Sequence, residues 1–238
     1  MRMGPITTDI IKNGLVFNMD AANRASYIPD ATTSFDTINP SSSGSLENGI
    51  NFLQPPISAS CWDFDGTDDY VDLGNNDFGL AYNKPLSISA WVNQSTSGQD
   101  TIVSKRDGSG AYKGWEVRIL STREIKFLFS TNGYSAYINT TSTTQLNMST
   151  WYHVVVTYDG SVTTGGFKIY INGVAETVSS ATAGTVTSIS TTTVASVAAR
   201  GAANLFFDGN IANVQIYNRA LSASEVLHNY NALKSRFE

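Results

Sequence analysis

The sequence predicts an all-β fold, an antiparallel sandwich or barrel with one short helix at its C-terminal end. Apolar and polar residues alternate with a period of two along most of the chain, as they do in strands with one buried face. The strand-like segments are rich in β-branched and aromatic residues and end at Gly, Asn, Asp or Pro. Charged residues make up 15% of the 238 residues, against roughly 25% in an average globular chain. Ser, Thr and Asn supply the polarity instead, which suits exposed strands and their turns.

Ten segments have the clearest strand pattern, and most are five to eight residues long. They are Leu15–Met19, Tyr70–Leu73, Leu86–Asn93, Thr101–Lys105, Trp115–Leu120, Glu124–Ser130, Tyr134–Asn139, Trp151–Tyr158, Phe167–Ile171 and Ile211–Tyr217. Asn132-Gly133 and Asn172-Gly173 predict tight hairpin turns, because both residue types tolerate a positive φ. Many short strands with turn signals at this spacing indicate a sandwich or a barrel.

Three regions have a weaker strand pattern. Residues 24–60 contain four prolines and few strand signals, which predicts a long loop around the sheets. The Ser/Thr-rich stretch 177–193 permits one or two irregular edge strands, and a solvated meander is an equal alternative. Residues 1–13 are expected to form an N-terminal extension. Because 41% of the residues are hydrophobic and all-β domains of this length are common, we expect residues 1–238 to form one domain.

The helix is predicted at the C-terminal end. Ser222 and Glu225 have the spacing of a capping box, in which each side chain bonds the backbone N–H of the other residue. Val226, Leu227, Tyr230 and Leu233 follow at helical spacing. The sequence therefore predicts a helix over residues 222–235 that covers part of the sandwich.

Composition excludes several classes of protein. The net charge is −5, whereas a nucleic-acid-binding protein carries a basic stripe, so no nucleic-acid partner is expected. One cysteine excludes an internal disulfide framework and a cysteine-based zinc site. No stretch approaches the roughly 18 apolar residues of a membrane span, so no membrane insertion is expected. The first residues do not resemble a secretory signal peptide, which suggests synthesis and retention in the cytosol until release.

Six segments together resemble a known superfamily. Residues 14–23 resemble its first strand, and Trp62–Gly74 contains its signature Phe-Asp-Gly-x-Asp-Asp-Tyr-Val. Residues 86–92 and 151–160 resemble two central strands, 167–174 a hairpin, and 209–225 the closing strand. In this order they resemble the concanavalin A-like, laminin G-like superfamily. The resemblance implies a two-sheet antiparallel jelly-roll sandwich.

The segments near the two ends of the chain resemble one subgroup of this superfamily. Residues 14–27, GLVFNMDAANRASY, and residues 209–237, which begin GNIANVQIYNRALS, resemble a subgroup found in virion proteins of tailed bacteriophages. This implies a non-catalytic virion structural protein, in head decoration or in the tail or a fibre, that acts in attachment or adhesion. Its partners would be other virion proteins, its location the virion assembled in the host cytoplasm. The alternative is an extracellular, lectin-like carbohydrate-binding module of a bacterium; a glycoside hydrolase is a more remote one.

The glutamates argue against catalysis. Glycoside hydrolases place two carboxylates roughly 5–5.5 Å apart for retention of configuration, and those with this fold have an E-x-D-x-E pattern on one strand. None of the six glutamates lies in that pattern. Glu116 and Arg118 alternate on one strand, which favours an ion pair on the same face. The sequence therefore predicts no enzyme activity.

Glycan binding is a further candidate chemistry, which would add host or environmental glycans to the virion proteins as partners. Sugars are held by aromatic rings together with polar groups for the hydroxyls. The candidates on loops or hairpin ends are Tyr27, Tyr82, Tyr112, Trp115, Tyr134 and Tyr137, with packing in the protein as the alternative role of each tyrosine. The predicted ligand residues among them are Tyr112, Trp115, Tyr134 and Tyr137. The glycine-rich segment Asp107–Gly114 is the most ligand-like loop, because it is polar, flexible and carries one aromatic residue.

Metal binding has two candidate regions. Five aspartates lie between residues 63 and 72, where turn chemistry is favoured over calcium. The resemblance implies a second place, a calcium ion at the rim, for which Asp20, Asp36 and Asn213 are the candidate ligands. Relatives have acidic residues where this closing strand has Ala212 and Asn213, so the site would be weakened. We expect no required cofactor, with a structural calcium as the open alternative.

Overall fold

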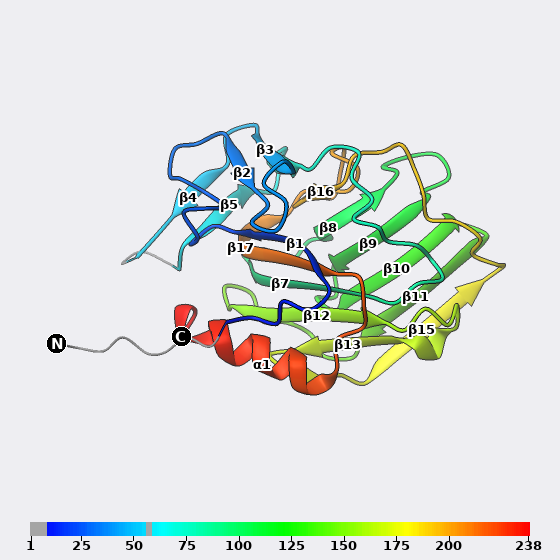
Figure 1. The fold of residues 1–238 in the computed structure, drawn as a ribbon. Coiled ribbons are helices and arrows are strands. Elements are labelled where there is room, and N and C mark those ends of the chain that lie inside the picture. The colour runs from blue at the N-terminus through cyan, green and yellow to red at the C-terminus, as the bar shows by residue number, and fades with distance from the viewer. Residues whose placement is uncertain (1–8, 56–58) are drawn as a thin grey trace.

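Two antiparallel β-sheets pack face to face, and one α-helix lies against the outer side of one of them (Figure 1). The structure, a computed structural model, describes residues 9–55 and 59–238. Of the expected N-terminal extension 1–13, residues 1–8 lie outside the described residues. The predicted fold class, an all-β two-sheet sandwich with a C-terminal helix, is confirmed.

The first sheet has eight strands. β1 (Leu15–Asp20) pairs with the second half of β17. In spatial order the other strands are β14 (Val174–Ala175), β13 (Phe167–Ile171), β12 (Tyr152–Tyr158), β7 (Leu86–Gln94), β17 (Asp208–Tyr217), β5 (Cys61–Asp65) and β4 (Asn51–Leu53).

The second sheet has nine strands. In spatial order they are β15 (Val178–Ala183), β11 (Ala136–Ser142), β10 (Ile125–Asn132), β9 (Gly114–Ile119), β8 (Asp100–Arg106), β16 (Ser196–Val197), β6 (Tyr70–Asp72), β3 (Ser43–Glu47) and β2 (Thr33–Phe35). The 3-10 turn η1 (Thr164–Gly166) precedes β13.

Each of the ten predicted strands overlaps an observed one, and β15 is an edge strand within the Ser/Thr-rich stretch. The prediction that residues 24–60 form a loop is wrong, because this region contains β2, β3 and β4. These strands have three to five residues and include Ser, Gly and Asn. They are too short for alternation to be read, and backbone pairing to neighbouring strands holds them.

The two predicted hairpin turns differ. Asn172 and Gly173 both have a positive φ, 51° and 80°, as a two-residue turn requires. Between β10 and β11, in contrast, neither Asn132 nor Gly133 is among the residues with positive φ, and three residues, 133–135, make the connection. The Asn132 side chain accepts the N–H of Tyr134 (3.0 Å), so it forms an Asx turn instead.

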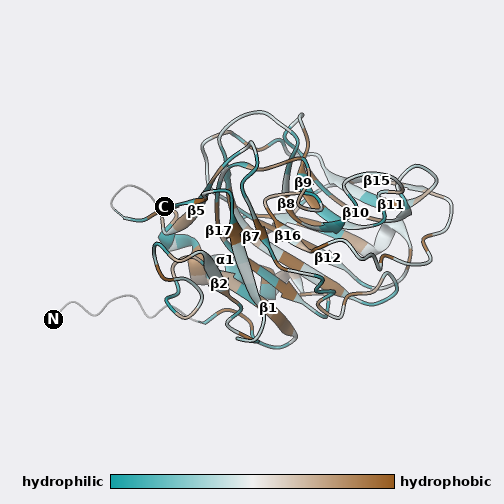
Figure 2. Ribbon diagram, turned by 90° about the horizontal axis from the view of Figure 1, so that it is seen from above, coloured by the Kyte–Doolittle hydropathy of each residue, from teal (hydrophilic) through white to brown (hydrophobic). Residues whose placement is uncertain are grey.

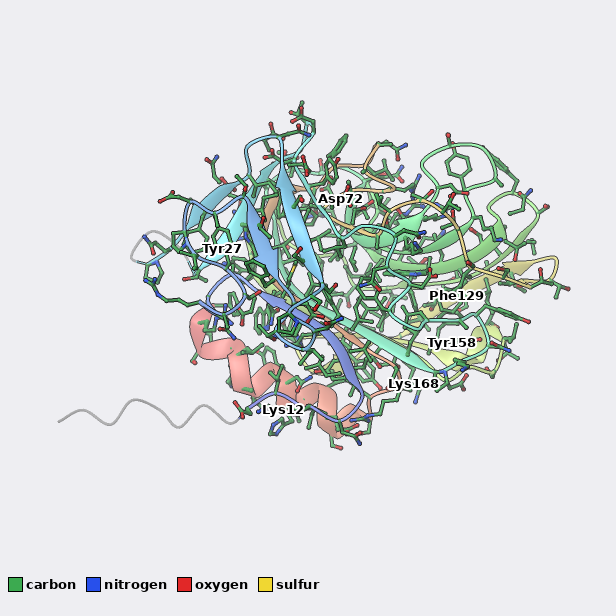
Figure 3. The ribbon with its side chains drawn as sticks, turned by 45° about the horizontal axis from the view of Figure 1, so that its top comes forward. Lys12, Tyr27, Asp72, Phe129, Tyr158 and Lys168 are labelled. Atoms are coloured by element: carbon green, nitrogen blue, oxygen red, sulfur yellow. The ribbon has the colours of Figure 1, made fainter. Side chains whose placement is uncertain are left out.

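The main core lies between the sheets. Alternate residues of every central strand point into it, and Figure 2 shows hydrophobic residues in brown along β1 and β12. Phe129 of β10 and Tyr158 of β12 meet edge to face across this layer, 5.0 Å between ring centres (Figure 3). Phe167 of β13 packs 4.5 Å from Tyr158. Aromatic contacts therefore join the two sheets.

The C-terminal helix α1 (Ala223–Leu233) covers the outer face of the eight-stranded sheet, and the 3-10 turn η2 (Lys234–Arg236) follows it. Its capping box is confirmed: Glu225 N–H donates to Ser222 Oγ (3.3 Å), and Ser222 N–H donates to Glu225 Oε2 (2.9 Å). Trp91 of β7 stacks on Phe237 (4.1 Å) and on Tyr230 (5.7 Å). We call this surface the covered face.

The outer face of the nine-stranded sheet has no such cover, because α1 is the one α-helix among residues 9–55 and 59–238. We call this surface the open face.

Within the described part of the chain, no helix has both the length and the apolar character needed to cross a membrane.

Candidate functional site

The open face carries the charged side chains of β9 and β10. Along β9, Trp115 and Val117 point into the core, so Glu116 and Arg118 point outward by strand alternation. Lys126 of β10 lies directly opposite Arg118 in the sheet register. The period of two that builds the core thus also gathers polar side chains on the other side.

Glu116 is the centre of a buried ion cluster. Its Oε1 accepts from Arg200 Nε (2.8 Å), and its Oε2 accepts from Arg106 Nη1 (3.1 Å) and Arg200 Nη2 (3.1 Å). The predicted Glu116–Arg118 pair is present but longer, at 3.9 Å. Burial alone would raise the pKa of Glu116, but the charges of Arg200, Arg118 and Arg106 outweigh it and lower that pKa. The carboxylate is therefore ionised and has no proton to donate.

Tyr112 forms a lid over this cluster. The guanidinium carbons of Arg106 and Arg200 lie 5.3 and 5.9 Å from the centre of its ring, a cation–π arrangement. Its backbone carbonyl accepts from Arg106 Nε (3.0 Å) and from Ser130 Oγ. The Tyr134 ring meets the Tyr112 ring edge to face at 5.5 Å. These contacts anchor the loop 107–114 that the sequence suggested to be flexible.

A cavity of about 250 Å³ opens beside the cluster. The residues that line it come from four neighbouring strands and one turn, and none is acidic. They are Arg106, Arg118, Lys126, Leu128, Gly133, Tyr137 and Asn139. The Nε atom of Arg118 is buried and has no hydrogen-bond partner among the described residues.

Three of the four predicted ligand residues gather at this end of the open face. Tyr137 lines the cavity, Tyr134 is 73% exposed and directly follows the cavity residue Gly133, and Tyr112 lies over the arginines. The fourth, Trp115, is a correction: it is 1% exposed and packs in the core against Phe78 (6.4 Å). Because Glu116 points outward, its neighbour Trp115 has to point inward, away from any ligand on this face.

The predicted metal ligands do not form a cation site. Both oxygens of Asp20 accept from the Arg236 guanidinium, each at 2.9 Å. Oδ1 of Asp36 accepts the N–H groups of Asn18 and Ile38, again at 2.9 Å. Asn213 pairs with Asp20 in register but brings no charge. Arg236 already neutralises Asp20, the residue that pairs with Asn213. The three predicted ligands therefore do not fit calcium.

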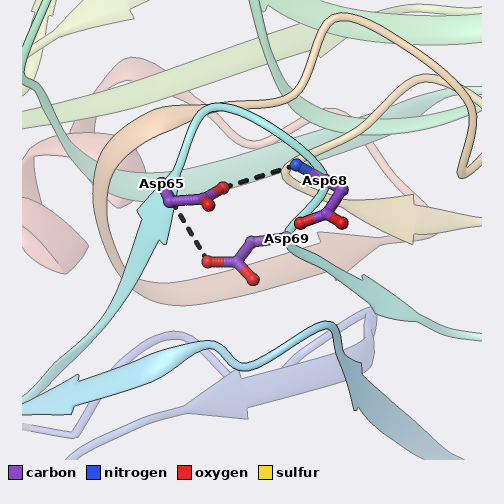
Figure 4. A group of neighbouring side chains, drawn as sticks. All are labelled: Asp65, Asp68 and Asp69. Atoms are coloured by element: carbon purple, nitrogen blue, oxygen red, sulfur yellow. Dashed lines mark hydrogen bonds between the residues drawn. The ribbon is translucent and has the colours of Figure 1, made fainter.

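Among the described residues, one group of three acidic side chains could hold a metal ion: Asp65, Asp68 and Asp69, with ligand atoms within 4.8 Å of one another (Figure 4). Their oxygens serve the local turn. Asp65 Oδ1 accepts the N–H groups of Thr67 (2.8 Å) and Asp68 (3.4 Å), and Asp69 Oδ2 accepts that of Asp65 (3.1 Å). This is the turn chemistry favoured by the sequence.

Sequence reasoning placed Arg118 beside Glu116 but did not assign Arg106, Lys126 or Arg200 to a site. Lys126 lies on a predicted strand, and counting alternate positions places it on the outer side, as Arg118 is on its own strand. Arg106 directly follows the predicted strand Thr101–Lys105 and belongs to the observed strand β8. Arg200 follows β16 in an irregular segment between residues 198 and 207. Arg200 and its partner Glu116 are 84 positions apart. No periodicity in the sequence predicts a contact between them.

Comparisons with known proteins agree with this architecture. The sequence profile of the Concanavalin A-like lectin/glucanases superfamily matches residues 65–227. The chain belongs to this superfamily. No curated protein matches the sequence itself.

Solved structures with the same fold include three binding proteins or enzymes. A Trypanosoma rangeli sialidase in complex with sialic acid aligns with 16% identity and a TM-score of 0.62, over 94% of this chain and 33% of the sialidase. The binding domain of Paraclostridial Mosquitocidal Protein 1 aligns with 14% identity and a TM-score of 0.64, over 92% of this chain and 52% of that domain. The binding domain of botulinum neurotoxin DC in complex with SialylT aligns with 16% identity and a TM-score of 0.61, over 92% and 52%. The chain thus spans between a third and about half of these structures, and the likeness concerns the fold.

Proposed function

We propose that this chain is a non-catalytic, lectin-like module that binds a glycan on the open face. The observation that carries the proposal is a polar cavity with Tyr137 on its wall, together with the Tyr112–Tyr134 ring pair, in which Tyr112 lies over the cavity residue Arg106. Aromatic rings can contact the apolar faces of sugar rings, while amide and charged side chains bond the hydroxyls. Asn139 and Lys126 on the cavity wall offer such groups.

Two of the structures with this fold are described with a sialic-acid-type ligand, the Trypanosoma rangeli sialidase with sialic acid and the botulinum neurotoxin DC binding domain with SialylT. The third is itself a binding domain. These descriptions support a glycan as the ligand class of this chain.

The absence of catalysis is also part of the proposal. Hydrolysis of a glycosidic bond needs one carboxyl group that can donate a proton and a second carboxylate. Glu116 is ionised among arginines, and no carboxylate lines the cavity. These features favour binding over turnover, and we propose that binding requires no metal ion.

A glycan array tests the proposal directly. Wild-type protein is expected to bind a defined subset of glycans, and Tyr137→Ala and Tyr134→Ala are expected to lose that binding at least about tenfold, a common effect of removing a contact aromatic residue. Phe35→Ala is the matched control, because Phe35 is an exposed aromatic residue on β2, at the opposite end of the same sheet. Equal binding by all four proteins, or no binding by any, contradicts the proposal.

For its biological setting we propose the virion of a tailed bacteriophage, as a head decoration or a tail or fibre component that contacts other virion proteins. The resemblance of residues 14–27 and 209–237 supports this, and these two segments lie side by side because β1 pairs with β17. A bacterial extracellular carbohydrate-binding module is the alternative. Mass spectrometry of purified particles tests the setting: the chain is expected among the virion proteins, and its absence sinks the virion proposal.

A further inference from the structure

Positively charged side chains outnumber carboxylates at the cavity on the open face. Arg106, Arg118, Arg200 and Lys126 surround a single carboxylate, that of Glu116. Both oxygens of this carboxylate are committed to Arg106 and Arg200. Among the described residues no carboxylate forms an ion pair with Lys126, and Arg118 has only the 3.9 Å contact to Glu116. Arg118 and Lys126 are therefore the two cations to which no carboxylate oxygen is committed.

The register of the sheet places these two cations directly opposite each other. Like charges at directly opposed positions destabilise a sheet. Burial lowers the pKa of Lys126, and the charges of Arg118 and Arg106 lower it further. The chain as a whole has a net charge of −5, so a local cationic pair does not follow from composition. The pair costs stability unless an anion lies between its members.

The size of the cavity limits that anion. Its volume of about 250 Å³ is slightly below the ~300–1,000 Å³ of sites for drug-sized ligands. It suits one sugar unit, and it is too confined for the backbone of a nucleic acid, which binds to broad basic stripes. Tyr137 stands on its wall beside the two cations.

We propose that the sugar unit bound in this cavity carries a negative charge, a carboxylate or a sulfate, which Arg118 and Lys126 hold between them. Arg118 is suited to bidentate contact with either group, and its buried Nε supplies a donor that has no partner within the described protein. Lys126 adds a point charge from the neighbouring strand. The proposal rests on glycan binding at the open face and names the class of glycan.

Calorimetric titration with matched sugars tests it. The probes are glucuronic acid and galactose 6-sulfate, with glucose and galactose as their neutral counterparts. The charged sugars are expected to bind at least about tenfold more tightly than the neutral ones, with affinity falling as salt is added. Lys126→Gln and Arg118→Gln are each expected to remove about tenfold of that affinity. The preference between the two charged sugars identifies the anionic group.

Lys168→Gln is the control, because it removes the same charge from an exposed position on β13 of the other sheet. It is expected to bind like the wild type. The melting temperature supplies a second readout: Lys126→Gln is expected to melt at the wild-type temperature or above it, since the like-charge pair is gone. A lower melting temperature would mark Lys126 as a structural residue and contradict the proposal.

The other outcomes separate this inference from the proposed function. Equal affinity for charged and neutral sugars, or full affinity in Lys126→Gln, overturns the charge inference and leaves glycan binding intact. If no sugar binds in titration or on the array, both fail. If sodium sulfate alone binds as tightly as galactose 6-sulfate, the site is a simple anion site. Tighter binding of a short single-stranded oligonucleotide, lost in Lys126→Gln, would assign the cations to nucleic acid instead.

Discussion

The two outer faces of this sandwich have opposite characters, although the same strand alternation produces both. On the covered face, Trp91 stacks on Phe237 and on His153 (5.2 Å) beneath the C-terminal segment. On the open face, Glu116 and its arginines lie under Tyr112 without a helix above them. A sheet needs cover only where its outer side chains are apolar. The helix therefore selects which face stays available for a ligand.

The stabilising interactions differ as well. The covered face is stabilised by aromatic packing, which is insensitive to salt. The open face depends on Glu116, whose charge compensates buried arginines. Variants on each side test this difference between the two faces.

The largest effect is expected from Glu116→Gln. It removes the carboxylate that compensates Arg106 and Arg200 while keeping the side-chain shape, and breaking a buried ion pair costs about 3–5 kcal/mol. Urea denaturation is the measurement, with Lys126→Gln as a control of near-wild-type stability. A loss of less than about 1 kcal/mol would show that the arginines are solvated without Glu116.

The second prediction concerns acid and the covered face. Burial lowers the pKa of His153 to about 3, against about 6.5 in an unfolded chain. The folded state therefore keeps this histidine neutral, and the stability that this provides is complete above pH 6.5 and is lost as the pH falls toward 3. The expected loss from this residue between pH 7 and pH 5 is about 2 kcal/mol.

The variant His153→Gln isolates this effect, because glutamine can still bond Ser89, whose Oγ lies 2.9 Å from His153 Nε2. As the pH falls from 7 to 5, the free energy of unfolding of the variant, relative to that of wild type, is expected to rise by about 2 kcal/mol. The comparison with wild type is necessary because burial raises the pKa of Asp100 to about 6, an opposite contribution over the same range. Parallel pH profiles of the two proteins would refute the buried, neutral histidine.

The third prediction removes part of the cover. Phe237→Ala takes away the ring that stacks on Trp91 at 4.1 Å. Because Phe237 is only partly buried, the expected loss is about 1–2 kcal/mol, below that of a fully buried aromatic residue. Trp91 fluorescence is expected to shift to longer wavelength as water reaches its ring. Glycan binding is expected to stay unchanged, and a large loss of binding would mean that the two faces are coupled.

The smallest effect is expected from calcium. Arg236 occupies both oxygens of Asp20, so neither a chelator nor added calcium should change the melting temperature. Binding at 100 times the dissociation constant would stabilise the protein by about 2.7 kcal/mol, which a melting curve resolves easily. A calcium-dependent rise that disappears in Asp20→Asn would contradict this account and restore the metal site at the rim.

Most of the fold could be predicted from the sequence, because in long strands the regular alternation of apolar and polar residues determines which face is buried. The strands β2, β3 and β4 could not, since each is too short to show a period. In the site, the alternation of strand residues places Glu116 and Arg118 on the outer face, and the same alternation places Trp115 in the core, away from a ligand. Arg200 was out of reach, because a loop after β16 brings it to Glu116.

The difference between the two faces places the ligand on the open face and not on the covered face. Amide chemical-shift mapping by NMR during titration with glucuronic acid can locate it. We expect shifts for residues of β9, β10 and β11 around Arg118, Lys126 and Tyr137, with no change along α1. Shifts confined to α1 and its contacts with Trp91, or spread evenly over the protein, would rule out a ligand site on the open face.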